Sequence, residues 1–349
     1  MPDTQPNLTP EPRPAHSAER WLYPTDAGLY CEPGNFYVDP HRPVERAVIT
    51  HGHADHARPG HRAVLSTPET AGIMQIRYGH EAAGGFETAT YGEVRRFGEV
   101  DVRFAPAGHI LGSTQVVLEH KGTRVVVSGD YKREQDPTCE PFEVVPCDVF
   151  VTEATFALPV FRHEPAQAEA ERLMASLQRE PDRPHLLGVY GLGKCQRMIA
   201  LLRQQGYDEV IWLHGALVAL CDFYMEQGVD LGDLRVIDAS VPGGVQRGLV
   251  LCPPAAISDR WSRRFQDPVT AFASGWMRIR ARARQRGIEL PLVVSDHADW
   301  PDLIATIMET GASSVWVTHG RDDALIYQLS RMGIRGKALA LVGFEDEAE

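Results

Sequence analysis

The segment of residues 51–56 constrains this chain more than any other feature of its sequence. It reads His-Gly-His-Ala-Asp-His and directly follows a short apolar run. Side chains two apart on an extended chain point the same way, so His51 and His53 can bind one ion. The turn that follows can bring Asp55 and His56 to a second ion. Imidazole with carboxylate suits zinc first, with manganese or iron as alternatives, and the segment predicts a metal-dependent hydrolase.

Further candidate ligands stand where other apolar runs end: His109, Asp130, Glu153, His297 and His319. Ligands at the ends of neighbouring buried strands converge on one rim of a sheet, where rigid elements hold them. A single histidine after a strand is more often a packed core or turn residue, and a single aspartate after glycine is more often a turn residue. Their repetition beside the 51–56 segment favours one shared site over these alternatives.

Length and composition limit the class of protein. A chain of 349 residues exceeds the range in which one core keeps growing, which predicts two domains or one domain with a large insertion. It has no apolar run long enough for a membrane span and no charged-then-apolar leader, which indicates a cytoplasmic protein without a membrane segment. The six cysteines form no Cys-x-x-Cys pair, which disfavours a zinc ribbon and a disulfide framework.

The order of patterns along the chain predicts an insertion. Residues 1–18 are proline-rich and are expected to form a flexible leader. Short β runs fill 19–158. Helix and strand patterns then alternate over 159–288, beginning with a helix over 166–179, which suggests an α/β unit with a parallel sheet. The ligand-bearing strand pattern returns over 289–344, so the second domain is inserted into the first.

These motifs together resemble the β-CASP group of metallo-β-lactamase-fold nucleases, and within it the bacterial ligase-associated DNA exonucleases. The match runs from about residue 21 to 342. The 51–56 segment resembles the family signature, and the residues that resemble its other motifs are Asp39, His109, Asp130, Glu153, His297 and His319. The resemblance implies an α/β fold: a metallo-β-lactamase αββα sandwich with an inserted α/β β-CASP cap domain.

The resemblance also implies roles for these residues. One divalent transition-metal ion, zinc first and manganese as the alternative, takes His51, His53 and His109. A second takes Asp55, His56 and His319, and Asp130 bridges the two, so that Asp55 and Asp130 belong to the catalytic set.

Three further residues support the implied metals. His297 is free to protonate the leaving oxygen, and Glu153 orients it and keeps it cationic. Asp39 is hydrogen-bonded to a ligand histidine.

Cationic segments of the predicted cap are candidates for nucleic-acid binding. Lys194 and Arg197 follow a glycine-rich strand-to-helix turn whose free N–H groups could hold a phosphate, although an ordinary turn would look the same. A second candidate segment contains Ser274, Arg278, Arg280, Arg282 and Arg284. A solvated charged face is the alternative for these arginines. The net charge of −12 makes local positive charge essential for any such contact.

The function implied is a metal-dependent nuclease that hydrolyses DNA phosphodiester bonds, as a 5′-to-3′ single-strand exonuclease in DNA repair beside a DNA ligase and a helicase. An RNA-processing endo- or exoribonuclease of the same group is the alternative. His319 supports a two-metal site but weakens the inference to DNA, because a histidine at this marker is usual in the RNA-processing members. A small-molecule hydrolase and a non-catalytic scaffold are the more distant alternatives.

Overall fold

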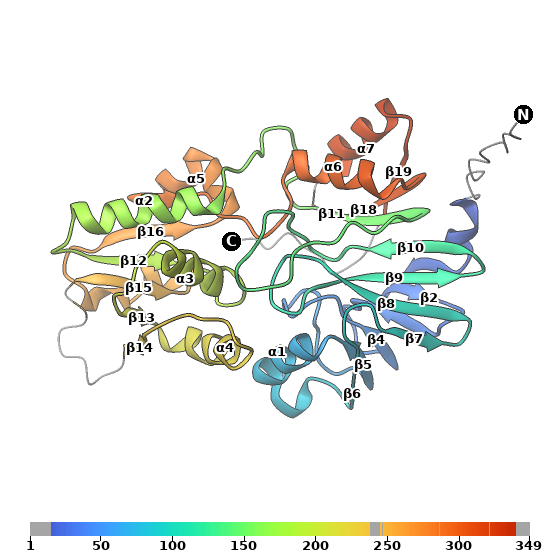
Figure 1. Ribbon diagram of the computed structural model, residues 1–349, viewed down its shortest axis with the longest axis horizontal. Helices are drawn as coiled ribbons and strands as arrows, with labels where there is room; N and C mark the ends of the chain where they lie inside the picture. Colours follow the sequence, from blue (N-terminus) through green and yellow to red (C-terminus); the bar gives the residue numbers. More distant parts are fainter. Residues whose placement is uncertain (1–14, 238–244, 246, 286, 321, 340–349) are drawn as a thin grey trace, which may run out of the picture.

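The computed structural model describes residues 15–237, 245, 247–285, 287–320 and 322–339 (Figure 1). Within these residues the chain is a mixed α/β protein whose strands form three sheets. Most of the predicted leader lies outside the described residues. Its last part does not: Ala15–Arg20 form a 3-10 helix and Ala18 is fully buried, so the ordered chain begins before residue 19.

The first sheet has six strands, and each neighbour in the sheet is also the next in sequence. Its strands are β1 (Leu22–Thr25), β2 (Gly28–Cys31), β3 (Phe36–Val38), β4 (Arg46–Val48), β5 (Ala63–Ser66) and β6 (Phe86–Thr88). The first three pair antiparallel and the remaining pairs are parallel. Helix α1 (Pro68–Tyr78) follows β5, begins with the Thr67 side chain accepting from the Thr70 N–H, and continues into a 3-10 turn, Gly79–Glu81.

The second sheet has seven strands in the order β19-β18-β11-β10-β9-β8-β7. These are β7 (Val94–Phe97), β8 (Val100–Pro106), β9 (Thr114–His120), β10 (Thr123–Val127), β11 (Val149–Ala154), β18 (Ser314–Gly320) and β19 (Arg335–Ala338). Strands β7 to β10 form an antiparallel meander, whereas β10, β11, β18 and β19 run parallel. Helix α6 (Trp300–Thr310) precedes β18, and α7 (Asp322–Arg331) connects β18 to β19.

The apolar core shows how these elements are layered. One cluster joins Val38 and Val48 of the first sheet to Phe104 and Trp316 of the second, so the two sheets pack face to face. Met74 of α1 packs on the outer side of the first sheet. A separate cluster places α6 and α7 on the outer side of the second sheet. The order is therefore helix, sheet, sheet, helix.

The third sheet is parallel throughout and has the order β14-β13-β15-β12-β16-β17. Its strands are β12 (Pro184–Gly188), β13 (Ile211–Leu213), β14 (Leu234–Val236), β15 (Gly248–Cys252), β16 (Val269–Ala273) and β17 (Leu290–Leu292). Helix α2 (Ala166–Arg179) precedes β12. The helices between the strands are α3 (Lys194–Gln204), α4 (Gly215–Glu226) and α5 (Arg280–Gln285), with 3-10 turns Pro254–Ile257, Ser262–Arg264 and Gly275–Arg278. The helix predicted over 166–179 coincides with α2.

The third sheet lies beside the two facing sheets (Figure 1). Of the helices that pack on the third sheet, α4 lies next to α1. Helices α1 and α4 approach closely, because a Cβ at Gly72 would come 2.5 Å from the ring of Phe223. The carboxyl ends of β12, β16 and β17 lead into the segments that approach the facing sheets. In the described part of the chain, no helix combines the length and apolarity that a membrane crossing needs.

Candidate metal centre

Four predicted ligands converge at the ends of strands from both facing sheets. His51 and His53 follow β4, His109 follows β8, and Asp130 follows β10. One ligand atom from each lies within 4.8 Å of the others. Gly129 permits this approach, because it has a φ of 56° and a Cβ there would come 2.8 Å from the side chain of Thr50.

Asp130 lies at the centre of this cluster. Its Oδ2 is 3.4 Å from His51 Nε2, 3.4 Å from His56 Nε2 and 3.8 Å from His109 Nε2. The Oδ2 of Asp55 lies 3.6 Å from the same His56 nitrogen. One carboxylate thus faces histidines of both predicted ligand sets, which is the position that a bridging ligand requires.

Hydrogen bonds to Nδ1 orient three of the histidines. His56 Nδ1 lies 2.7 Å from Asp39 Oδ2, and His109 Nδ1 lies 2.8 Å from the backbone oxygen of Asp296. His51 Nδ1 lies 3.0 Å from the hydroxyl of Thr50. Acceptors at Nδ1 leave Nε2 as the nitrogen available to an ion.

His53 has the opposite orientation from the other three. Its Nε2 lies 3.3 Å from the backbone oxygen of Leu192, a residue between the third sheet and α3, and its Nδ1 faces His109 Nε2 at 3.0 Å. No sequence motif predicted the contacts of Thr50, Leu192 or Asp296. Only the proximity of Thr50 and Asp296 to predicted ligands could have suggested them.

The donor set fits a cation. His51 Nε2 and Asp55 Oδ1 are buried and have no hydrogen-bond partner in the part of the chain that the structure describes. A buried polar atom without a partner is costly, and a cation at the cluster would supply one. Burial also lowers the pKa of His109 to about 3 and the pKa of His51 well below its usual value. Both imidazoles are therefore neutral near pH 7, which is the form that binds metal.

His297 and Glu153 form a second group at the same cluster. His297 Nδ1 lies 2.9 Å from Glu153 Oε2 and 3.9 Å from Asp130 Oδ2. Glu153 is buried, and its other oxygen accepts from the Tyr131 N–H at 2.8 Å. Burial alone would lower the pKa of His297, but the charges of Glu153 and Asp130 raise it to about 9. The ring is a cation near neutral pH and is positioned beside the predicted metal ligands.

The role of His319 as a metal ligand stays a prediction. It lies in β18, one residue before Gly320, which pairs with Ala154 at the end of β11. Its backbone therefore runs beside the strand that carries Glu153. Its side chain lies outside the described residues, as do the side chains of Arg280 and Arg282.

The predicted phosphate-binding residues differ in their surroundings. Arg278 and Arg284 are exposed. Lys194 is buried, with Nζ 3.3 Å from Asp296 Oδ2 and 4.8 Å from the centre of the Tyr190 ring. Ser274 is 1% exposed, and its hydroxyl accepts from the Trp276 N–H.

Arg197 does not fit the role that the sequence predicted for it. It is 1% exposed, and its guanidinium donates to the backbone oxygen of Ser295 and to Glu134, each at 2.6 Å. A side chain enclosed in this way has no surface to offer a phosphate. The sequence could not reveal this, because its partners are 98 and 63 residues away along the chain.

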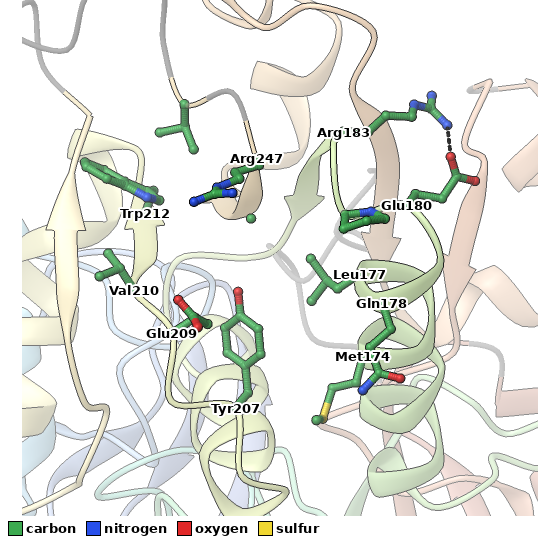
Figure 2. A pocket seen from close by; sticks show the side chains of 13 residues that line it. Met174, Leu177, Gln178, Glu180, Arg183, Tyr207, Glu209, Val210, Trp212 and Arg247 are labelled. Carbon is green, nitrogen blue, oxygen red and sulfur yellow. Dashed lines mark hydrogen bonds and ion pairs between the residues drawn. The ribbon is translucent and has the colours of Figure 1, made fainter.

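Two cavities lie at opposite ends of the third sheet. One of about 420 Å³ adjoins the histidine cluster and is lined by residues that include His53, Arg77, Tyr190, Lys194 and His297. A larger one of about 760 Å³ lies at the amino ends of β12, β13 and β15 and contains none of the predicted site residues (Figure 2). Ligands of parallel sheets bind at the carboxyl ends of strands, which is where the smaller cavity lies.

Comparison with known proteins supports the resemblance given by the motifs. A probable DNA ligase of Opitutus terrae is 27% identical over 325 residues, which is 91% of this chain and 31% of that protein. Endoribonuclease YSH1 of Gibberella zeae is 31% identical over 121 residues, 33% of this chain and 14% of that protein. An RNase J-like protein of Methanocaldococcus jannaschii is 24% identical over 229 residues, 57% of this chain and 54% of that protein. The chain thus spans only part of the length of each relative.

A solved structure and the family models complete the comparison. A protein of unknown function from Enterococcus faecalis V583 has a TM-score of 0.57 and 12% identity, with 86% of this chain and 80% of that chain covered, and shows a similar fold. No family model matches the chain. Strand-end histidines around a central aspartate form a group that could hold a metal ion. The motifs and these relatives agree in making the chain similar to the β-CASP nucleases of the metallo-β-lactamase fold.

Proposed function

We propose that this chain is a metal-dependent nuclease that hydrolyses phosphodiester bonds. The observation that carries the proposal is the central position of Asp130 among histidines of both predicted ligand sets, with His297 beside it. The helix–sheet–sheet–helix layers would be the metallo-β-lactamase sandwich, predicted over residues 19–158 and 289–344, and the parallel sheet would be the β-CASP cap, predicted over 159–288. The last strand of that sheet, β17, spans Leu290–Leu292 and pairs with β16, so the parallel sheet runs past the predicted boundary at residue 288.

Two divalent ions would divide the ligands as the resemblance implies: His51, His53 and His109 for one, Asp55, His56 and His319 for the other, and Asp130 for both. Imidazole and carboxylate donors favour zinc, with manganese as the alternative. When bound, such a pair of cations supplies positive charge that offsets the charge developing on a phosphodiester.

His297 would be the proton donor to the leaving oxygen. Its raised pKa keeps the proton on the ring near neutral pH, and Glu153 holds Nδ1, so that the other ring nitrogen remains for the substrate. His297 also lines the 420 Å³ cavity, where a nucleotide could reach it. Asp39 would hold His56 and Thr50 in place from behind the ligands.

Single-stranded DNA, degraded from a 5′ end during repair, is the proposed substrate. Its support is the Opitutus terrae relative, which is named as a probable DNA ligase and is similar over 91% of this chain. A segment like this one therefore occurs within a longer polypeptide of that name. Association with a DNA ligase, and with a helicase that supplies single strands, is part of the same proposal.

RNA is the second candidate substrate, favoured by the relatives named as endoribonuclease and RNase J-like protein. The test is a matched comparison of DNA and RNA strands of one sequence, labelled at the 5′ or the 3′ end, with zinc or manganese. Asp130→Ala protein is the control for contaminating nucleases. Faster cleavage of RNA would reverse the substrate assignment, and no cleavage of either strand would overturn the nuclease proposal.

A further inference from the structure

A buried cluster of charges joins the third sheet to the metal-centre layers. Its members come from α3, from the loop after β10 and from the segment after β17: Lys132, Lys194, Arg197, Glu134, Asp136 and Asp296. All are buried except Glu134, which is partly exposed. Three positive and three negative groups balance, which is the condition under which such burial is tolerated. None is a proposed metal ligand or the proposed proton donor.

Arg197 is the member that contacts most of the others. Its Nη1 donates to the Ser295 backbone oxygen and lies 3.6 Å from Asp296 Oδ1, while its Nη2 donates to Glu134. A planar guanidinium can hold a carbonyl on one side and a carboxylate on the other, which a single ammonium cannot do in the same geometry. Lys194, one turn earlier on α3, holds the other oxygen of Asp296.

The segment held in this way is the one that carries the proposed chemistry. The Ser295 hydroxyl accepts from the His297 N–H at 3.0 Å, which fixes the backbone of the proposed proton donor. The backbone oxygen of Asp296 lies 2.8 Å from Nδ1 of His109, a proposed metal ligand. The segment has no helix or strand of its own. Its position therefore depends on such side-chain contacts.

We propose that Arg197 is a positioning residue, through which α3 holds residues 295–297 and thereby places His297 and His109 together. The expected effect on cleavage rests on the proposed nuclease function. The positioning role itself rests on the contacts described above. Loss of the guanidinium would leave the Ser295 oxygen without its donor and the Asp296 carboxylate without one of its two ion-pair partners. A displacement of this kind lowers the rate without removing any reacting group.

The test uses Arg197→Lys in the full chain loaded with metal, because lysine preserves the charge balance of the cluster. Arg203→Lys is the matched control. Arg203 lies on the same helix but donates to backbone oxygens within the third-sheet region alone, those of Tyr207, Glu209, Leu231 and Asp233. We expect kcat of Arg197→Lys to fall by roughly 10- to 100-fold with KM changed less than about threefold. The control should keep both constants.

Hydrogen exchange gives a readout that does not depend on activity. The amides of His297 and Ala298 are bonded to the Ser295 hydroxyl and the Tyr131 oxygen, and they should exchange faster in Arg197→Lys and unchanged in the control. If wild-type protein cleaves no nucleic acid, the nuclease proposal fails, and exchange alone decides the positioning role. Unchanged exchange in Arg197→Lys, or equal losses in both variants, would overturn it.

A second variant alters the same contact at Asp296, the residue that pairs with Arg197. Asp296→Asn keeps the shape of the side chain and its backbone oxygen but removes its ion pairs with Lys194 and Arg197. Faster exchange at His297 and a lower kcat at similar KM are expected here too. If Arg197→Lys fails to fold, a normal Asp296→Asn protein would overturn the proposal.

Discussion

The two ends of the parallel third sheet differ in whether their charged residues are buried. At the carboxyl ends, Lys194 and Asp296 are buried, paired and close to the histidine cluster. At the amino ends, Arg247 and Glu209 are exposed around a cavity of about 760 Å³ (Figure 2). Of these four residues, the two beside the smaller cavity are buried and the two beside the larger cavity are exposed. Buried and compensated charge therefore coincides with the proposed metal centre, whereas the larger cavity volume does not.

The largest effect is expected from Asp130→Ala. Loss of the carboxylate that faces both histidine sets should lower the rate by roughly 10⁴-fold and reduce binding at both metal positions. Metal analysis of purified wild-type protein should find close to two transition-metal ions per chain, and fewer in the variant. A wild-type protein that stays metal-free and still cleaves in chelator would contradict the metal centre.

His297→Ala and His319→Ala should separate the proton donor from the ligand. The first should slow cleavage by roughly 10²–10⁴-fold and retain both ions, because a general acid is lost and no ligand. The second should lose affinity for one ion. The measurement is metal content alongside the rate. Equal metal loss in the two variants would show that the division of roles is wrong.

The pH dependence should report His297. Its pKa is raised to about 9 by Glu153 and Asp130 against the effect of burial, so the ring is protonated below that value and neutral above it. Metal ions at Asp130 would offset part of its charge. The rate of metal-loaded protein should therefore decline with a midpoint above 6.5 and no higher than about 9. His297→Gln should lack this decline, and a variant that keeps it would assign the titration to another group.

The raised pKa of His297 also predicts the direction in which stability changes with pH. A histidine whose pKa is raised on folding adds stability that is fully present below its unfolded value of 6.5. That contribution is lost as pH rises through the folded value. Metal-free wild-type protein should thus lose stability between about pH 6.5 and 9 relative to His297→Gln. Chemical unfolding at several pH values would measure it.

Local patterns predicted that the strand-end residues would lie close together, because strand direction alone brings such positions together. The helix over 166–179 follows from composition, which is a local property. The return of strands to the facing sheets was predicted from residue 289, but the first strand after it, β17, belongs to the third sheet, and the return begins at β18. His109 and Asp130 were predicted as ligands because each follows an apolar run, and parallel or facing strands bring such positions to one rim of the fold.

Arg197 shows what a local pattern cannot predict. It follows the glycine-rich turn, as a phosphate-binding residue would, but its surroundings are set by Glu134 and Ser295 from distant segments. The same holds for Leu192, whose backbone oxygen approaches His53 across two parts of the fold. Burial of a charge depends on partners that only tertiary structure supplies.

A smaller effect is expected for the exposed arginines of the segment that connects β16 to β17. Arg278→Ala or Arg284→Ala should weaken nucleic-acid binding with little dependence on base sequence and flatten the log–log salt dependence by about one unit. Binding titrations at several salt concentrations would measure the slope. An unchanged slope would make these residues a solvated surface.

The smallest effect on cleavage is expected at the amino ends. Arg247→Glu changes an exposed charge on the rim of the larger cavity, so stability should stay within about 0.5 kcal/mol and the rate should be unaffected.

Trp212→Ala removes a half-buried ring from the same cavity wall and should lower stability by about 1–3 kcal/mol, less than a fully buried tryptophan would. Its rate at a temperature where it is folded should match wild type. Urea unfolding beside cleavage rates would check both variants. A large loss of cleavage in Arg247→Glu would mean that nucleic acid also uses the amino ends, and the contrast between the two ends would fail.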